Sequence, residues 1–176
     1  DDPRLKSYFS AAQDGRDNDG NITQTVAGVK QLTSIEGKFK GVRQGTGVGD
    51  NRYSTHSRTT ITTSSKIIVM AAAEVWFLRA EAALRGFTSE DVESCYKQGV
   101  TTSFAQWDAS GVSEYLESEN TPADYVDTFD KNFDAKATTS ITPKWDNTAD
   151  NETKLERIIT QKWLAIYPEG CEAWAE

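Results

Sequence analysis

One stretch of the chain constrains the fold more than any other. Residues 69–85 consist largely of Ala, Leu, Glu and Arg, which are strong helix formers, and Gly86 follows them directly. A glycine immediately after such a run is typical of a helix C-cap. The sequence therefore predicts a helix over residues 69–85, about 25 Å long at a rise of about 1.5 Å per residue.

A second helix is predicted over residues 89–107. Ser89 is a suitable N-cap because acidic residues follow it, and apolar or small residues then recur at helical spacing. Two helices joined by so short a turn must pack antiparallel, and the small side chains of Ala80 and Gly99 would allow a close approach. Residues 67–107 thus resemble one tetratricopeptide-like (TPR-like) unit. Such units need about three repeats to cover their apolar faces, so we expect neighbours outside this chain or in less obvious segments.

The two segments that flank this pair predict little regular structure. Residues 1–66 are rich in Gly, Ser, Thr, Asn and Asp, and we expect a loop-rich segment with short strands, for example over 38–42. Residues 108–150 predict acidic loops and two short helices, over 111–118 and over 122–131. In the second of these, Pro122 would take the first helical position.

The last segment, residues 151–176, predicts C-terminal helices. Its apolar residues recur every three or four positions and predict one buried stripe, formed by Leu155, Ile158, Ile159, Trp163, Leu164 and Ile166. Pro168 would end this helix, and another begins near Gly170 and stops within two turns. We therefore expect a truncated chain. The fold class is mainly α: a TPR-like helical hairpin plus further helices with long irregular loops, in a single partial domain over 1–176.

Composition excludes several classes of protein. The 176 residues carry 19 basic and 27 acidic side chains, a net charge of −8, and residues 108–156 hold most of the acidic surplus. Nucleic acid is not expected as a partner, because phosphate binding needs clustered Lys and Arg. The acidic segment is expected to be a solvated face. No run of about 18 apolar residues occurs, so no membrane-spanning helix is predicted.

The residues that catalysis would need are absent or badly placed. His56 is the sole histidine, and its polar segment predicts a surface loop. Cys95 falls on the predicted buried face of a helix, as a small core residue does. No pair of carboxylates is marked out for glycosidase chemistry. We expect no enzyme activity and no cofactor. Cys95 and Cys171 could form one disulfide bridge or none.

Two loop motifs suggest ion or phosphate binding only weakly. Residues 45–49 are rich in glycine but lack the Lys-Ser/Thr of a phosphate-binding loop. An EF-hand is excluded around residues 17–20, because its twelfth position would be Val26 and not Glu. A weaker alternative is an irregular calcium site that uses Asp14, Asp17 and Asp19.

Several blocks carry a family resemblance. They read AEVWFLRAEAALRG at 73–86, YKQGVTTSF at 96–104, IITQKWLAIY at 158–167 and GCEAW at 170–174. These blocks resemble the SusD/RagB family of SusD-like outer-membrane glycan-binding lipoproteins. DPRL at 2–5 and GKFKGV at 37–42 look like the middle region of the same family.

The resemblance implies an incomplete SusD-like α fold, from the C-terminal half of a longer protein. It implies non-catalytic binding of an oligosaccharide or polysaccharide at the surface of a Bacteroidetes-type cell, and delivery to a TonB-dependent, SusC-like outer-membrane transporter. Contact with the membrane would be through a lipid anchor absent from this chain. The alternative is a TPR-like protein-interaction scaffold without glycan binding.

Sugar sites usually combine exposed aromatic rings with hydrogen-bonding groups. The rings at core-like helical positions are those of Trp76, Tyr96, Trp163 and Trp174. Tyr53, Trp107 and Trp145 instead fall in or beside loops. We therefore predict these three as the glycan-binding residues.

Overall fold

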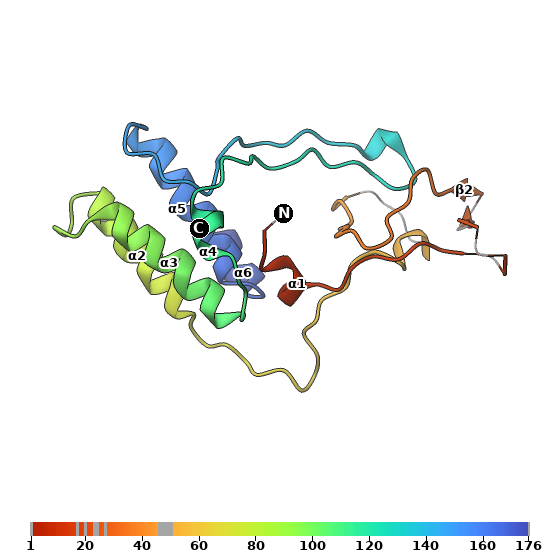
Figure 1. Cartoon of the computed structure of the whole chain (residues 1–176), viewed down its shortest axis with the longest axis horizontal. Helices are drawn as coiled ribbons and strands as arrows, with labels where there is room; N and C mark the ends of the chain where they lie inside the picture. The colour runs from red at the N-terminus through yellow and green to blue at the C-terminus, as the bar shows by residue number, and fades with distance from the viewer. Residues whose placement is uncertain are drawn as a thin grey trace. The chain divides into compact units, whose positions relative to one another are not determined.

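The computed structural model describes residues 2–16, 18–19, 21–22, 25–26, 28–45 and 51–175. They belong to two compact units. The element labels used below are those of Figure 1 where it prints them. Unit 1 comprises Asp1–Arg4, Ser64–Pro122 and Thr139–Glu176. Unit 2 comprises Leu5–Thr63 and Ala123–Thr138. The expected single domain over 1–176 stays a prediction.

Unit 1 is helical, which confirms the mainly α fold class. Its elements are α2 (Ala72–Leu84), α3 (Val92–Gln106), α4 (Val112–Leu116), α5 (Asn151–Ala165) and α6 (Gly170–Ala175). Helices α2 and α3 pack side by side as a hairpin, as Figure 1 shows, and α5 packs against both. The hairpin confirms the predicted helix pair, although α2 begins three residues later than predicted. Asp91, not Ser89, caps α3, because its carboxylate accepts the backbone N–H of Ser94 at 2.8 Å.

The core of unit 1 lies where α2, α3 and α5 meet. Phe77 of α2, Tyr96 and Phe104 of α3 and Ile158 of α5 are buried almost completely. Gly99 makes the close approach of α2 and α3 possible. A Cβ atom at Gly99 would lie only 2.7 Å from the ring of Phe77, so the small residue is required as predicted.

A buried arginine joins the start of the chain to this core. Arg4 is 0% exposed and forms an ion pair with Asp2 at 2.6 Å. Its guanidinium also donates to Ser103 Oγ of α3 and to Gln161 Oε1 of α5, each at 2.9 Å. The same group lies 5.0 Å from the centre of the Phe104 ring. The charge of Arg4 is therefore buried with hydrogen-bond partners.

Helix α5 begins as expected but buries a different face. Asp150 caps it by accepting the backbone N–H of Thr153 at 2.7 Å. Ile158 and Ile166 are buried, whereas Trp163 is 56% exposed. The buried side chains on this helix are those of Arg157, Ile158, Gln161, Lys162 and Ala165. The prediction that Trp163 lies in the core was wrong. Trp163 is two positions from the buried Gln161, which places it on the other side of the helix. Trp174 was also wrongly placed, since it is 90% exposed.

Unit 2 is loop-rich, as predicted. It contains α1 (Leu5–Tyr8), the 3-10 helices η1 (Asn51–Tyr53) and η2 (Lys131–Phe133), and the short antiparallel strands β1 (Thr25–Val26) and β2 (Val29–Lys30). Thr25 pairs with Lys30 and Val26 with Val29.

Two elements predicted in this unit are absent from its described residues. Residues 38–42 form no strand, because the carbonyls of Lys38 and Lys40 accept from separate segments, at Ala12 and Ser57, and build no ladder. Residues 122–130 form no helix, because the side chain of Asp127 bonds nearby backbone N–H groups instead, and only Lys131 of the predicted helix is helical, at the start of η2.

The two cysteines are free thiols, Cys95 buried and Cys171 exposed. Burial raises the pKa of the Cys95 thiol, as expected for a core residue and not for a nucleophile. In the part of the chain that the structure describes, none of the helices combines the length and the apolar character needed to cross a bilayer.

Candidate functional site

Two segments far apart in sequence meet in unit 2 around one carboxylate. Tyr53 ends η1, and the backbone N–H of His56 bonds back to its carbonyl at 3.0 Å. The second segment is a loop that runs from Tyr125 to Ala135. The backbone N–H of each of these two residues donates to the backbone carbonyl of the other, which closes the loop. We call Tyr53, His56, Tyr125, Asp127 and Phe129 the tyrosine–aspartate cluster.

Asp127 is the centre of this cluster. Its side chain is buried and accepts the backbone N–H groups of Phe129 at 2.8 Å and Asp130 at 2.9 Å. The hydroxyls of Tyr125 and Tyr53 donate to the same carboxylate at 2.9 and 3.1 Å. Burial alone would raise the pKa of Asp127, but these hydrogen bonds outweigh it and hold the pKa below its ordinary value. Asp127 is therefore an anion that fixes two tyrosines.

The two tyrosines are held protonated. Burial, followed by the charge of Asp127 and its hydrogen bond, raises the pKa of Tyr53 to about 12. Burial and the bond to Asp127 also raise the pKa of Tyr125. Both phenols are donors at physiological pH and are poorly suited to act as bases. Their rings remain half-buried, so part of each ring faces solvent.

His56 packs against the ring of Tyr53 and is not the surface residue that its polar neighbours predict. It is 4% exposed, and its Nε2 lies 2.9 Å from the hydroxyl of Thr128. Its ring is edge-on to Tyr53 at 5.0 Å between centroids and stacks on Phe129 at 6.3 Å. Burial lowers the pKa of His56; the charge of Asp127 opposes this effect and that of Lys40 adds to it.

Cationic side chains lie at the edge of the cluster. Lys40 Nζ donates to the carbonyl of Val126 at 3.0 Å, and the guanidinium of Arg43 donates to the carbonyl of Phe133 at 3.2 Å. The site thus combines rigid, partly exposed rings with ammonium, guanidinium and hydroxyl groups. Such an arrangement can bind a polar ligand that also has apolar faces, as sugars do.

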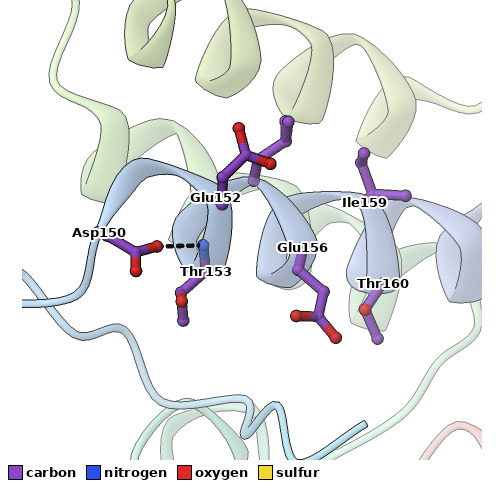
Figure 2. Close-up of a pocket in the computed structure, with 7 residues that line it drawn as sticks. Asp150, Glu152, Thr153, Glu156, Ile159 and Thr160 are labelled. Atoms are coloured by element: carbon purple, nitrogen blue, oxygen red, sulfur yellow. Dashed lines mark hydrogen bonds between the residues drawn. The ribbon is translucent and has the colours of Figure 1, made fainter. Parts of the chain in front are cut away.

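A recess of about 470 Å³ lies on α5 in unit 1. Figure 2 shows side chains that line it. It is lined by Asp150, Glu152, Thr153, Leu155, Glu156, Ile159 and Thr160. Asp150 is occupied in capping the helix, and Glu156 accepts a hydrogen bond from the hydroxyl of Thr139. The lining contains no aromatic ring, so the recess lacks the stacking surface typical of sugar sites.

The structure separates the three residues predicted to bind glycan. Tyr53 belongs to the tyrosine–aspartate cluster. Trp107 follows α3 in unit 1, where its half-buried ring lies 5.9 Å from that of Tyr167. Trp145 is 8% exposed and packs on Tyr96 at 5.0 Å between ring centroids. Burial weighs against contact between Trp145 and a ligand, and the glycan-binding role of all three stays a prediction.

Asp14 of the alternative calcium site is used in hydrogen bonds within the chain. The carboxylate of Asp14 accepts from Gln31 Nε2 at 2.7 Å, Ser34 Oγ at 2.7 Å and the backbone N–H of Ile35 at 2.9 Å. Asp17 and residues 46–49 of the glycine-rich loop lie outside the described residues. Among the residues described, Asp19 included, no group of three or more His, Cys, Asp or Glu side chains is placed to hold a metal. Asp14 is a structural carboxylate that organises residues 31–35.

Sequence reasoning missed Tyr125, Asp127 and Phe129. They lie in the segment that was expected to be an acidic solvated face with a short helix. The sequence gives no periodic signal for them, because Tyr125 and Val126 are both apolar and Asp127 and Thr128 are both polar.

A sequence model of the SusD-like family, described as "Susd and RagB outer membrane lipoprotein", matches residues 1–176. The chain belongs to this family. Membership confirms the predicted family and fold class, and the expected location as a surface-exposed lipoprotein of the outer membrane. No curated protein matches the chain.

Solved structures of SusD homologues agree with this assignment. A homologue from Bacteroides vulgatus is 40% identical, with a TM-score of 0.80 over 99% of this chain and 33% of its own length. One from Bacteroides thetaiotaomicron is 32% identical, with a TM-score of 0.81 over 99% of this chain and 34% of its own. A chitin-binding SusD homologue from Flavobacterium johnsoniae is 34% identical, with a TM-score of 0.80 over 99% and 33%. This SusD-like chain therefore spans about a third of the length of these relatives.

Proposed function

We propose that this chain is part of a non-catalytic lipoprotein that binds oligosaccharide or polysaccharide at the bacterial cell surface. The family match over residues 1–176 carries the proposal, and the similarity to a chitin-binding homologue supports it. The protein then delivers the glycan to a TonB-dependent, SusC-like transporter in the outer membrane.

The tyrosine–aspartate cluster is the glycan contact that we propose in this chain. Tyr53 and Tyr125 present half-buried rings, and Asp127 fixes both through their hydroxyls. A site fixed before binding loses little side-chain entropy when the sugar arrives. Lys40 and Arg43 supply donors for sugar hydroxyls close by.

Glycan binding by the purified chain tests this proposal. A glycan array that includes chitin oligosaccharides identifies a ligand, and titration calorimetry then compares variants. Tyr53→Ala and Tyr125→Ala should each weaken binding about tenfold, equivalent to about 1.4 kcal/mol. Tyr53→Phe keeps the ring and should bind within about threefold of the unaltered chain, a difference of less than about 0.7 kcal/mol.

Trp163→Ala is the matched control, because it removes a ring that is 56% exposed in unit 1. Its affinity should not change. Equal affinity in the Trp163 and Tyr53 variants would contradict the proposed contact, and an array without any bound glycan would contradict the function.

The alternative, a TPR-like scaffold without glycan binding, is favoured by one observation. Helices α2 and α3 form the close-packed hairpin that such scaffolds repeat. Capture of a protein partner by a chain that binds no sugar on the array would favour this alternative.

A further inference from the structure

An apolar run in unit 1 lies unusually open to solvent. Ile67, Val69 and Met70 precede α2 and are 89%, 94% and 65% exposed. Residues 69 and 70 were predicted to lie in the helix, but they are irregular, and α2 starts only after Ala71. Single exposed apolar residues are common, whereas a contiguous group of large ones marks an interaction site.

Ile68, Val69 and Met70 form one wall of a recess of about 280 Å³. Ile166, at the end of α5, contributes a further apolar side chain to the lining. Glu169 and Glu172 come from the chain that leads into α6 and from α6 itself, and Glu74 comes from the first turn of α2. The lining of the recess therefore combines apolar side chains with three carboxylates.

The three carboxylates are not neutralised by cations. None of Glu74, Glu169 and Glu172 forms an ion pair within the described residues. The hairpin pairs other carboxylates, such as Glu81 with Arg85 at 2.8 Å. A surface that combines exposed apolar side chains with carboxylates that form no ion pair within the described residues is complementary to an apolar segment that carries positive charge.

We propose that this recess docks a segment of a partner protein that presents apolar side chains together with lysine or arginine. The apolar side chains of the partner cover Val69 and Met70, and its basic groups face Glu74, Glu169 and Glu172. Burial of the exposed run supplies affinity, and the charges select the partner and its orientation. The glycan contact proposed above lies in unit 2 and shares no residue with this surface.

The test uses the purified chain and two labelled amphipathic peptides of equal length. One peptide combines leucine with lysine, and the other replaces every lysine with glutamate. Fluorescence anisotropy should show saturable binding of the lysine peptide, with affinity that falls as salt is added. The glutamate peptide should bind at least tenfold more weakly, because like charges then meet at the recess.

Variants of the chain show where the lysine peptide binds. Val69→Ser combined with Met70→Ser should weaken binding of the lysine peptide about tenfold, because apolar burial is lost. Glu169→Gln combined with Glu172→Gln should weaken it about fivefold, as expected for a few surface charge pairs. Glu152→Gln combined with Glu156→Gln is the matched control, since it removes the same charge from the other acidic recess (Figure 2). This control should bind like the unaltered chain.

Three results would overturn the proposal. They are equal binding of the two peptides, equal binding by the Val69/Met70 variant and the control, and a dimer of the chain that the Val69/Met70 variant abolishes. The last result would show that a second copy occupies the recess. Because the altered residues are largely exposed, circular dichroism should show the same helix content in every variant. Glycan binding is measured separately, so neither outcome depends on the other.

Discussion

The guanidinium of Arg4 has no contact with solvent. Its partners lie as far apart in the sequence as Asp2 and Gln161. Asp2 neutralises it, Ser103 and Gln161 accept from it, and the Phe104 ring lies against it. Removing one partner of a buried ion pair leaves the other partner's charge uncompensated and typically costs about 3 kcal/mol or more.

Arg4→Ala should therefore lower the free energy of unfolding by about 3 kcal/mol, with the loss of the pair and of packing both contributing. Urea denaturation followed by circular dichroism measures this change. Lys136→Ala is the control, because its ion pair with Asp124 is exposed and should contribute little. A similar loss in both variants would show that burial of Arg4 is not the cause.

His56 makes the stability of unit 2 depend on pH. Its pKa in the folded chain is lowered, so below about pH 6.5 the unfolded chain takes up a proton that the folded chain does not. Stability should therefore fall as pH decreases from 7 to 5. Asp127 affects stability in a different pH range. Because its pKa is lowered in the folded chain, its contribution to stability is lost only as the pH falls below about 4.

Thermal unfolding midpoints at several values between pH 5 and pH 8 test this expectation. His56→Gln should flatten the fall in the midpoint between pH 7 and pH 5. The variant keeps a polar group that can reach Thr128 Oγ1, which lies 2.9 Å from Nε2 in the unaltered chain. An unchanged pH profile in the variant would assign the dependence to other groups.

At the scale of elements, α2 and α3 pack so closely that no side chain fits at Gly99. Gly99→Ala would place a methyl group 2.7 Å from the ring of Phe77, and the ring is buried and cannot move aside freely. Overpacking of this kind costs about 1–3 kcal/mol, more than the roughly 1 kcal/mol that alanine adds to helix propensity. We expect a net loss of stability.

Urea denaturation should show a lower midpoint for Gly99→Ala. Gly170→Ala, at the start of α6, is the control because a Cβ atom there would meet no atom within 4 Å. Its midpoint should stay unchanged. A more stable Gly99→Ala chain would mean that helix propensity outweighs the contact with Phe77.

The helices could be predicted because their signals are local. Residues 72–84 and 151–165 carry their helix formers and caps within a few positions, and both helices formed close to the expected bounds. The loop from Tyr125 to Ala135 could not be predicted in the same way. Its conformation depends on Asp127 bonding Tyr53, more than 70 residues earlier. Trp145 lies in a loop as predicted, but it packs on Tyr96 and is buried, which its local sequence could not show.

At the scale of the whole molecule, charge divides between the two units. Unit 1 contains nine basic and eighteen acidic residues, whereas unit 2 contains ten basic and nine acidic. The acidity that the sequence assigns to residues 108–156 thus belongs mainly to the helical unit. The tyrosine–aspartate cluster lies in the nearly neutral unit, where an acidic glycan would meet less repulsion.

Unit 2 is built from two stretches, and the α2–α3 hairpin lies between them in the sequence. Tyr53 comes from the first stretch, and the carboxylate that fixes its hydroxyl comes from the second. A protease cut between residues 64 and 122, with separation of the products, would leave the ring on one piece and its anchor on the other. Neither product would then retain the proposed sugar contact, so we expect that shorter versions of this protein need a continuous chain from Tyr53 to Asp127.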